Sequence, residues 1–170
     1  RSRMSEDLAA AMAAALGRAV AAAPEARTHG GSINDCCRWQ TEHGPVFVKR
    51  APLARRVMID AEADGLERLR QAGALRVPSF LAAGETESEA FLILEWLDLV
   101  EPGGASEEKF GVALAWQHRC RAQAYGLERD NFIGATAQPN DVLDDWVRFW
   151  RERRLLYQLD LAANNGHIGR

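Results

Sequence analysis

The chain has 170 residues, which is enough for one domain with a sizeable core or for two small lobes. Hydrophobic residues make up 47% and charged residues 26%, as in an ordinary globular protein, and a net charge of −3 leaves no basic surface for nucleic acid. The longest apolar stretch, residues 8–23, is too short and too rich in alanine to span a membrane, and it lacks the organisation of a signal peptide.

The first predicted element is an alanine-rich helix. Ser5 provides a capping hydroxyl, and two acidic residues follow it near the positive end of the helix dipole. The pattern continues to about Ala23 and stops at a proline. Residues 1–3 precede the first methionine and are interpreted as a remnant of expression, and residues 1–27 as a whole are assigned to this N-terminal helix and the remnant.

Two strands joined by a turn are predicted next. Residues 33–39 and 46–49 carry the β-branched and aromatic residues of strands, and residues 41–44 form the turn. Alternation along the second strand places Phe47 and Lys49 on one face of the sheet and the two valines beside them on the other. A lysine at the end of a strand usually extends its ammonium group into solvent, so Lys49 alone is a weak indication of function.

Residues 57–72 show helical periodicity, and Gly73 is the predicted terminator. One acidic residue, Glu62, lies within the apolar stripe of this helix, which otherwise consists of Met58, Gly65, Leu66 and Leu69. A carboxylate among apolar neighbours needs a partner, because burying an unpaired charge is costly. Lys49, on the strand before the helix, is the predicted partner. The alternative is that Glu62 lies at the solvent edge of the stripe.

Two further strands are expected after this helix. Residues 77–81 contain a proline and read as a short edge strand, residues 91–96 read as a buried strand, and residues 84–89 form the turn between them. The order of helix, hairpin, helix and two strands predicts an α+β fold. In it, one helix packs on a small antiparallel sheet, and residues 28–98 form the first lobe.

The second half of the chain is predicted to begin a helical lobe, residues 99–170. Helices are expected at 106–125 and 141–163, with a loop at 126–140 between them. The last helix carries an apolar stripe and further apolar residues on other faces; the stripe consists of Leu143, Trp146, Val147, Trp150, Tyr157 and Leu161. A helix that is apolar around much of its circumference needs neighbours, so we expect either an incomplete lobe or self-association through this helix.

A glycine pair, a strand lysine and a helix glutamate occur in that order, which is the nucleotide-binding layout of protein-kinase-like folds. The backbone of Gly30 and Gly31 can approach an anion closely because no Cβ intervenes, although most such pairs are simple turns. No G-x-G-x-x-G motif follows a strand and no G-x-x-x-x-G-K-[ST] motif is present, which disfavours the dinucleotide-binding fold and the P-loop. Residues 94–97 occupy the place where kinase-like folds pass between lobes and bind adenine; the alternative is a core strand that runs into a loop.

The chain resembles the fructosamine (ketosamine) 3-kinase family from about residue 28 to residue 167. The resemblance rests on the order and spacing of the segments GGSIN, GPVFVKR, MIDAEADGLERL, VPSFLAAG, FLILEWLDL, LAWQHR, YGLERDNFIGATAQPN and DDWVRFWRERRLLYQLDLA. The most specific part is the run that joins DN-x-IG, QPN and W-x-x-FW-x-x-RRL.

The resemblance implies an ATP-dependent kinase that uses Mg²⁺ and phosphorylates a sugar hydroxyl of a small-molecule or protein-bound ketosamine, which leads to deglycation. It assigns the phosphate hairpin, the phosphate-binding lysine, its glutamate anchor and the adenine hinge to Gly30, Gly31, Ser32, Ile33, Asn34, Lys49, Glu62, Glu95, Trp96 and Leu97. It assigns substrate-side or cleft-shaping roles to Asp130, Asn131, Gln138 and Asn140. The alternative for Asn140 is a cap of the next helix.

The chain departs from the family pattern in its acidic residues. In the family, the catalytic aspartate and the metal-binding acid lie in HGD and DP motifs after the last matching segment, and no HGD is present here. We therefore expect these 170 residues alone to bind nucleotide weakly at best and not to catalyse. Two alternatives stay open. One is a non-catalytic kinase-like lobe that acts as an interaction module, and the other is a kinase for another acceptor such as an aminoglycoside or choline.

The three cysteines make a poor disulfide framework, which indicates a reducing compartment and hence the cytoplasm. Some family members have a cysteine in the glycine-rich hairpin, where this chain has Ser32, so a redox switch is not transferred. Cys36 and Cys37 should face opposite sides of a strand, and His118 and Cys120 should point in different directions from a helix. No metal site is therefore expected, and these residues are interpreted as core thiols and a packing histidine.

Overall fold

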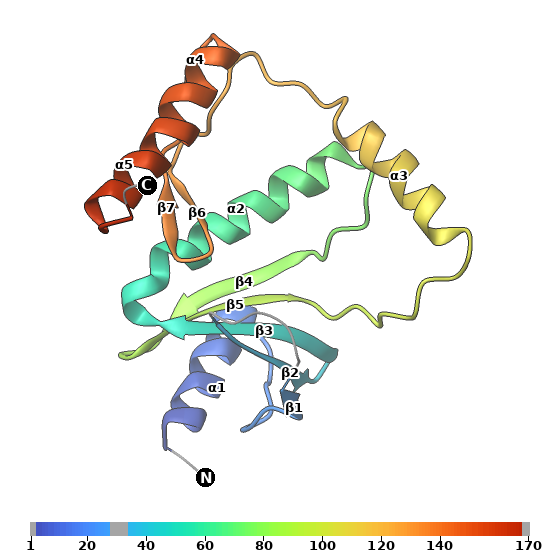
Figure 1. Ribbon diagram of the computed structural model, residues 1–170. Coiled ribbons are helices and arrows are strands. Elements are labelled where there is room, and N and C mark those ends of the chain that lie inside the picture. The colour runs from blue at the N-terminus through green and yellow to red at the C-terminus, as the bar shows by residue number, and fades with distance from the viewer. Residues whose placement is uncertain (1–2, 28–33, 168–170) are drawn as a thin grey trace. The chain divides into compact units, whose positions relative to one another are not determined.

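The computed structural model describes residues 3–27 and 34–167, and it divides into two compact units, Arg1–Cys120 and Arg121–Arg170. Each unit is described by itself (Figure 1). The predicted lobe boundary near residue 98 lies inside the first unit, and it stays a prediction.

An antiparallel sheet forms the centre of the first unit, and its strands follow the order β1-β2-β3-β5-β4 over the described residues. The strands are β1 (Ala26–Arg27), β2 (Asp35–Thr41), β3 (Gly44–Pro52), β4 (Phe80–Glu85) and β5 (Glu89–Glu95). Helix α1 (Arg3–Leu16) lies on one face of this sheet and helix α2 (Arg56–Ala72), which follows a short 3₁₀ turn (Leu53–Arg55), lies on the other (Figure 1). The predicted small antiparallel sheet with a packed helix is confirmed, and α1 adds a helix on the opposite face.

Each face of the sheet has its own apolar cluster. On the first face, Leu8 and Met12 of α1 pack against Cys37, Trp39, Val46, Val48, Ala82, Phe91 and Ile93. On the second face, Ile59 of α2 packs against Phe47, Ala51, Ala90, Leu92 and Leu94. Because successive residues of β3 project to opposite faces, its two valines enter the first cluster and Phe47 the second, as predicted.

The N-terminal helix is shorter than predicted. It ends at Leu16 rather than near Ala23, because Gly17 adopts a left-handed backbone conformation with φ 66°. The segment after it runs beside β2, where the indole N–H of Trp39 donates to the carbonyl of Ala21 at 2.6 Å. Helix α1 and the segment after it therefore belong to the first unit, and α1 packs on its sheet.

The second helix follows the prediction closely, whereas the edge strand begins and ends later than predicted. Helix α2 ends at Gly73, which has a φ of 69° as a glycine terminator should. Strand β4 lies at the sheet edge but covers residues 80–85 rather than 77–81, so it extends into the predicted turn. Gly84 of β4 lies opposite Phe91 of β5, and an added Cβ would lie 2.5 Å from the end of the phenyl ring, so only glycine fits there.

Helix α3 (Ser106–Gln117) is shorter than the predicted helix over 106–125. The backbone of Tyr125 cannot continue a helix, because its N–H and its C=O each pair with Leu143 at 2.8 Å. Two residues of the predicted helix end, His118 and Cys120, are exposed, so their interpretation as packing residues is wrong. The apolar side chains of α3 are spread around its circumference, and none of its residues is fully buried.

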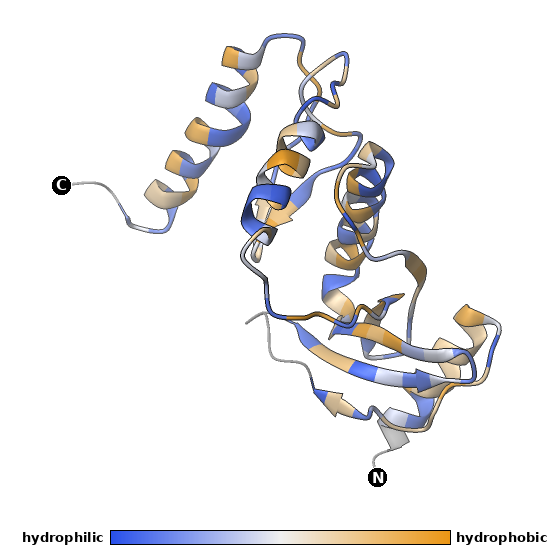
Figure 2. Cartoon of the chain, turned by 90° about the vertical axis from the view of Figure 1, so that its right-hand side faces the viewer, coloured by the Kyte–Doolittle hydropathy of each residue, from blue (hydrophilic) through white to orange (hydrophobic). Residues whose placement is uncertain are grey.

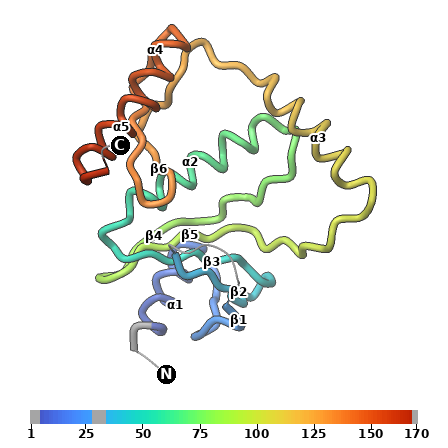
Figure 3. The backbone as a smooth tube through the Cα atoms, viewed as in Figure 1, coloured from blue at the N-terminus to red at the C-terminus, as the bar shows by residue number. Residues whose placement is uncertain are grey.

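The second unit combines a hairpin with a helix. Strands β6 (Asn131–Ile133) and β7 (Thr136–Gln138) lie within the segment predicted as a loop. The helix consists of α4 (Trp146–Trp150), the π-helical segment η2 (Arg151–Leu156) and α5 (Tyr157–Asn164), and the backbone coils from α4 to α5 without interruption (Figure 3). It begins later than predicted, because the Asp145 carboxylate caps α4 by accepting the N–H of Arg148 at 2.6 Å.

The π-helical segment changes which residues of this helix share a face. The predicted stripe assumed α-helical spacing, but a π-helix has more residues per turn, so Tyr157 and Leu161 do not continue the line of Trp146 and Trp150. Hydrophobic positions recur along this helix (Figure 2). Large apolar side chains on it are exposed, namely Trp146, Val147, Trp150, Leu155, Leu156 and Leu159. Self-association through this helix stays a prediction. In the part of the chain that the structure describes, no helix is long and apolar enough to cross a membrane.

The position of α2 depends on Ile59, which is completely buried in its cluster. We expect Ile59→Ala to lower the free energy of unfolding by about 2–5 kcal/mol, because it removes buried methyl groups and leaves a cavity. Val57→Ala, at a residue that is 61% exposed on the same helix, should change it by less than about 0.5 kcal/mol. Urea denaturation of both variants measures the difference. Equal effects would show that α2 is not held by this contact.

Candidate functional site

The centre of the candidate site is an ion pair between a strand and a helix of the first unit. Lys49 projects from β3 on the face that α2 covers, and its Nζ lies 2.5 Å from Oε2 of Glu62. The two side chains are 21% and 33% exposed, so the pair is partly shielded but still reachable from solvent. The predicted contact between Lys49 and Glu62 is confirmed, whereas their role in nucleotide binding is a separate prediction.

The helix face that carries Glu62 is rotated from the predicted one. The buried residue of α2 is Ile59, with Leu66 packed beside it, whereas Leu69 is 48% exposed. Glu62 follows Ile59 by three residues and therefore lies at the edge of the apolar stripe rather than at its centre. Both predictions for Glu62 are therefore correct. It lies at the solvent edge of the stripe, and from there its carboxylate reaches Lys49.

The adjacent cysteines lie on opposite faces of β2, as predicted. Cys36 is the direct cross-strand neighbour of Lys49 and shares its face, whereas Cys37 enters the α1 cluster. Burial raises the pKa of the Cys36 thiol, and the Lys49 ammonium partly opposes this. Burial also raises the pKa of Cys37, to about 11, and its thiol donates to the carbonyl of Val48 at 3.7 Å. Both behave as buried core thiols, and Cys120 is exposed; all three are free.

The predicted phosphate hairpin is described only at its end. Gly30, Gly31, Ser32 and Ile33 lie outside the described residues. Asn34, the last residue of that group, directly precedes β2, and its side-chain oxygen is buried with no hydrogen-bond partner in the described part of the chain.

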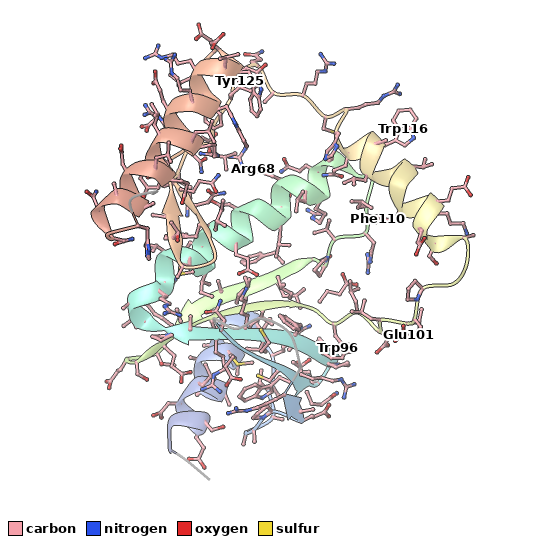
Figure 4. The ribbon with its side chains drawn as sticks, in the orientation of Figure 1. Arg68, Trp96, Glu101, Phe110, Trp116 and Tyr125 are labelled. Atoms are coloured by element: carbon pink, nitrogen blue, oxygen red, sulfur yellow. The ribbon has the colours of Figure 1, made fainter. Side chains whose placement is uncertain are left out.

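The predicted hinge, residues 95–97, begins where β5 ends, and Figure 4 shows Trp96 at this place. The carboxylate of Glu95 accepts the N–H of Ser79 at 3.1 Å and pairs with Arg76. These contacts, that of Ser79 first, hold the pKa of the Glu95 carboxyl below its usual range. The N–H of Glu95 also donates to the carbonyl of Ser79 at 2.9 Å. The Glu95 side chain therefore anchors the hinge to the segment before β4 and is not free for a ligand.

The four predicted substrate-side residues meet in the second unit around one buried side chain, that of Asn140, which is 1% exposed. Its amide group donates to the carbonyl of Arg129 at 3.1 Å and to Oδ1 of Asn131 at 2.8 Å. Its backbone N–H donates to the carboxylate of Asp130 at 2.8 Å. Asn140 therefore holds the start of β6 to the end of β7. It does not cap a helix, and its side chain has no exposed atom for a substrate.

The residue that completes this network, Arg154, was not singled out from the sequence. It lies in η2 and donates to Oδ1 of Asn140 and to the carbonyl of Pro139, both at 2.6 Å. The amide of Gln138, with its oxygen assigned toward the guanidinium, accepts from Arg154 at 2.6 and 2.8 Å. Arg154 also stacks on Phe149 at 4.6 Å, and its burial lowers the pKa of the guanidinium, which the nearby Asp130 opposes.

The W-x-x-FW-x-x-RRL run contains Arg153 and Arg154, but nothing in it tells which of the two points inward, because that direction depends on the π-helical turn. Asp130 is exposed and Asn131 and Gln138 are half-buried, so these three keep their predicted substrate-side or cleft-shaping role as a prediction. Across residues 3–27 and 34–167, no three His, Cys, Asp or Glu side chains are grouped to hold a metal ion. We therefore assign no Mg²⁺ ligand.

Comparison with known protein families identifies the chain. A family model described as fructosamine kinase matches residues 4–169. The chain therefore belongs to the fructosamine kinase family, and the predicted resemblance is confirmed.

The chain spans about half the length of the curated relatives it matches. A "probable ketoamine kinase" of Enterococcus faecium is 36% identical over 133 residues, which cover 78% of this chain and 46% of that protein. A chloroplastic protein-ribulosamine 3-kinase of Arabidopsis thaliana is 36% identical over 138 residues, which cover 79% of this chain and 42% of that protein.

Two solved structures share the fold. The crystal structures of a "putative fructosamine-3-kinase" from Haemophilus somnus and of another from Thermobifida fusca both match with a TM-score of 0.81. They are 28% and 29% identical to this chain, of which the matches cover 94% and 96%. The matches cover 55% and 56% of those two proteins. This confirms the predicted kinase-like fold class.

The burial of the cysteines predicts an order of alkylation. With a pKa of about 11, about one Cys37 thiol in a thousand is ionised at pH 8, and its burial blocks access as well. We expect iodoacetamide at pH 8 to modify the exposed Cys120 first and Cys37 only after unfolding. Peptide mass spectrometry measures the order, and modification of Cys37 as fast as Cys120 in the folded chain would contradict it.

The network around Asn140 predicts a local loss of stability. Asn140→Ala removes an acceptor of Arg154 and a donor to the carbonyl of Arg129, so we expect the hairpin to lose about 1–3 kcal/mol of local stability. Hydrogen exchange of the β6 and β7 amides measures this loss. Asn164→Ala, at an exposed position of α5, is the matched control and should leave hairpin exchange unchanged.

Proposed function

We propose that the protein is an ATP-dependent ketosamine kinase that transfers a phosphoryl group to a sugar hydroxyl on a glycated amine, as a step in deglycation. The observation that carries this proposal is the ion pair of Lys49 in β3 and Glu62 in α2, at 2.5 Å. The names of the relatives, ketoamine kinase and ribulosamine 3-kinase, support the acceptor class.

The ion pair suits a lysine that binds phosphate oxygens. An ammonium group has three N–H donors, and Glu62 occupies one direction, which leaves others for the α- and β-phosphates of ATP. Because Lys49 is only 21% exposed, water weakens its attraction for a phosphate less than at an open surface.

The reaction also needs a base for the sugar hydroxyl and Mg²⁺ ligands, and no residue described here is assigned to either role. When bound, Mg²⁺ would neutralise charge on the phosphates. We therefore expect these 170 residues by themselves to bind ATP weakly and not to transfer phosphate. The protein expressed from its complete gene is the form in which activity should be measured.

The test is phosphorylation of fructosyl-lysine by that complete protein with ATP and Mg²⁺, followed by mass spectrometry of the sugar phosphate. Lys49→Met should lower the rate by about 100-fold or more, because it removes the charge that holds the phosphates. The chain has one other lysine, so Lys109→Met, at an exposed position of α3, is the matched control and should retain the wild-type rate. Glu62→Gln should give an intermediate loss, because it keeps a hydrogen-bond acceptor for Lys49 but not the charge.

The other outcomes identify the alternatives. Phosphorylation of an aminoglycoside or choline but not of fructosyl-lysine would place the protein among kinases for another acceptor. Absence of ATP binding, together with concentration-dependent association that ATP does not alter, would identify a non-catalytic interaction module. Equal activity of Lys49→Met and Lys109→Met would refute the proposed role of the ion pair.

A further inference from the structure

The sheet face that carries Lys49 also carries a second cation, Arg38 of β2. The pairing of β2, β3 and β5 places Arg38 in one cross-strand row with Phe47 and Leu94. The neighbouring row contains Cys36, Lys49 and Leu92. Side chains in adjacent rows of this kind project to the same face, so Arg38 lies on the ion-pair side of the sheet, toward the end where β5 leads into the hinge.

Arg38 contacts both the start of the sheet and the hinge. Its guanidinium pairs with the carboxylate of Glu25, just ahead of β1, and lies 5.2 Å from the centre of the Trp96 ring. The indole N–H of Trp96 in turn donates to the carboxylate of Asp98 at 2.8 Å. Figure 4 shows Trp96 where β5 leaves the sheet, near the hairpin of β2 and β3. These four residues form a continuous chain of contacts from the edge of the sheet to the hinge.

The hinge needs such a contact because the regular structure ends there. Between β5 and α3, residues 96–105 form neither strand nor helix. On one side, Glu95 anchors the hinge to Ser79 and Arg76. On the other side, Glu95 pairs with Val46 of β3, and Arg38 stacks on Trp96, the first residue after β5. Fixing a binding segment before the ligand arrives improves affinity, because less order has to be imposed on binding.

We infer that Arg38 is a positioning residue of the nucleotide site: held by Glu25 and stacked on Trp96, it fixes residues 95–97 for contact with the nucleobase. The inference rests on the proposed function, since it assumes that the hinge binds a nucleotide. In this role Arg38 acts through its contact with Trp96.

The test combines hydrogen exchange of the hinge amides with the Kd for ATP, both in the protein from its complete gene. Arg38→Gln should increase exchange at residues 96 and 97 several-fold and weaken ATP binding by about two- to fivefold, the range that a partly exposed cation–π contact permits. Trp96→Leu should do the same. The double variant should show the same hinge exchange and the same Kd for ATP as either single variant, because both substitutions remove one shared contact. Arg38→Lys keeps a cation over the ring and should restore most of the affinity.

The chain offers a matched control in Arg119, which stacks on Trp116 at 4.6 Å away from the hinge. Arg119→Gln removes a contact of the same kind and should change neither hinge exchange nor the Kd. Unchanged hinge exchange in Arg38→Gln would overturn the inference, and so would an effect equal to that of Arg119→Gln. If Arg38→Gln exchanges its hinge amides faster than wild type but the wild-type protein binds no ATP, the proposed function is overturned and the positioning of the hinge by Arg38 is not. The two failures are therefore distinguishable.

Discussion

The Lys49–Glu62 ion pair is the interaction on which the candidate site depends. It exists because α2 lies on the sheet face to which Lys49 projects, and α2 lies there because Ile59 is buried against that face. An ion pair of this partly exposed kind contributes little to stability by itself. Its value is geometric, since it holds an ammonium group in one direction where a phosphate can reach it. The apolar packing thus determines the electrostatics of the site.

Much of the first unit could be predicted from its residues. Strand alternation located Phe47 and Lys49 correctly, and the glycine at residue 73 correctly ended α2, because both follow from local backbone geometry. The exact face of α2 could not be predicted, since helical spacing alone does not tell whether Met58 or Ile59 becomes the buried residue. Tertiary packing decides that choice, and it moved Glu62 from the centre to the edge of the stripe.

The second unit was less predictable because its order comes from non-local contacts. The hairpin of β6 and β7 is short. Asn140, which follows β7, holds it, because its side chain bonds to residues at the start of β6 and to Arg154 of η2. The Asn, Gly and Pro residues of segment 126–140 predicted a loop, and this composition does not indicate that the Asn140 side chain is buried. The π-helical turn has no recognisable sequence pattern either, although it directs Arg154 inward. Asp130, Asn131, Gln138 and Asn140 therefore have a structural role in the hairpin, because they hold its backbone together with Arg154. A substrate contact would be additional to this role.

Strand β3 has a paired neighbour on each side, β2 and β5, and this has a mechanical consequence. A slip of one residue in β3 would turn the lysine toward α1 and present a valine to the helix glutamate, since side chains alternate. Such a slip would break the backbone hydrogen bonds of β3 to both β2 and β5. An outer strand, β1 or β4, could shift by breaking its bonds to one neighbour. Changes in the outer strands can therefore accumulate without misdirecting the ammonium group.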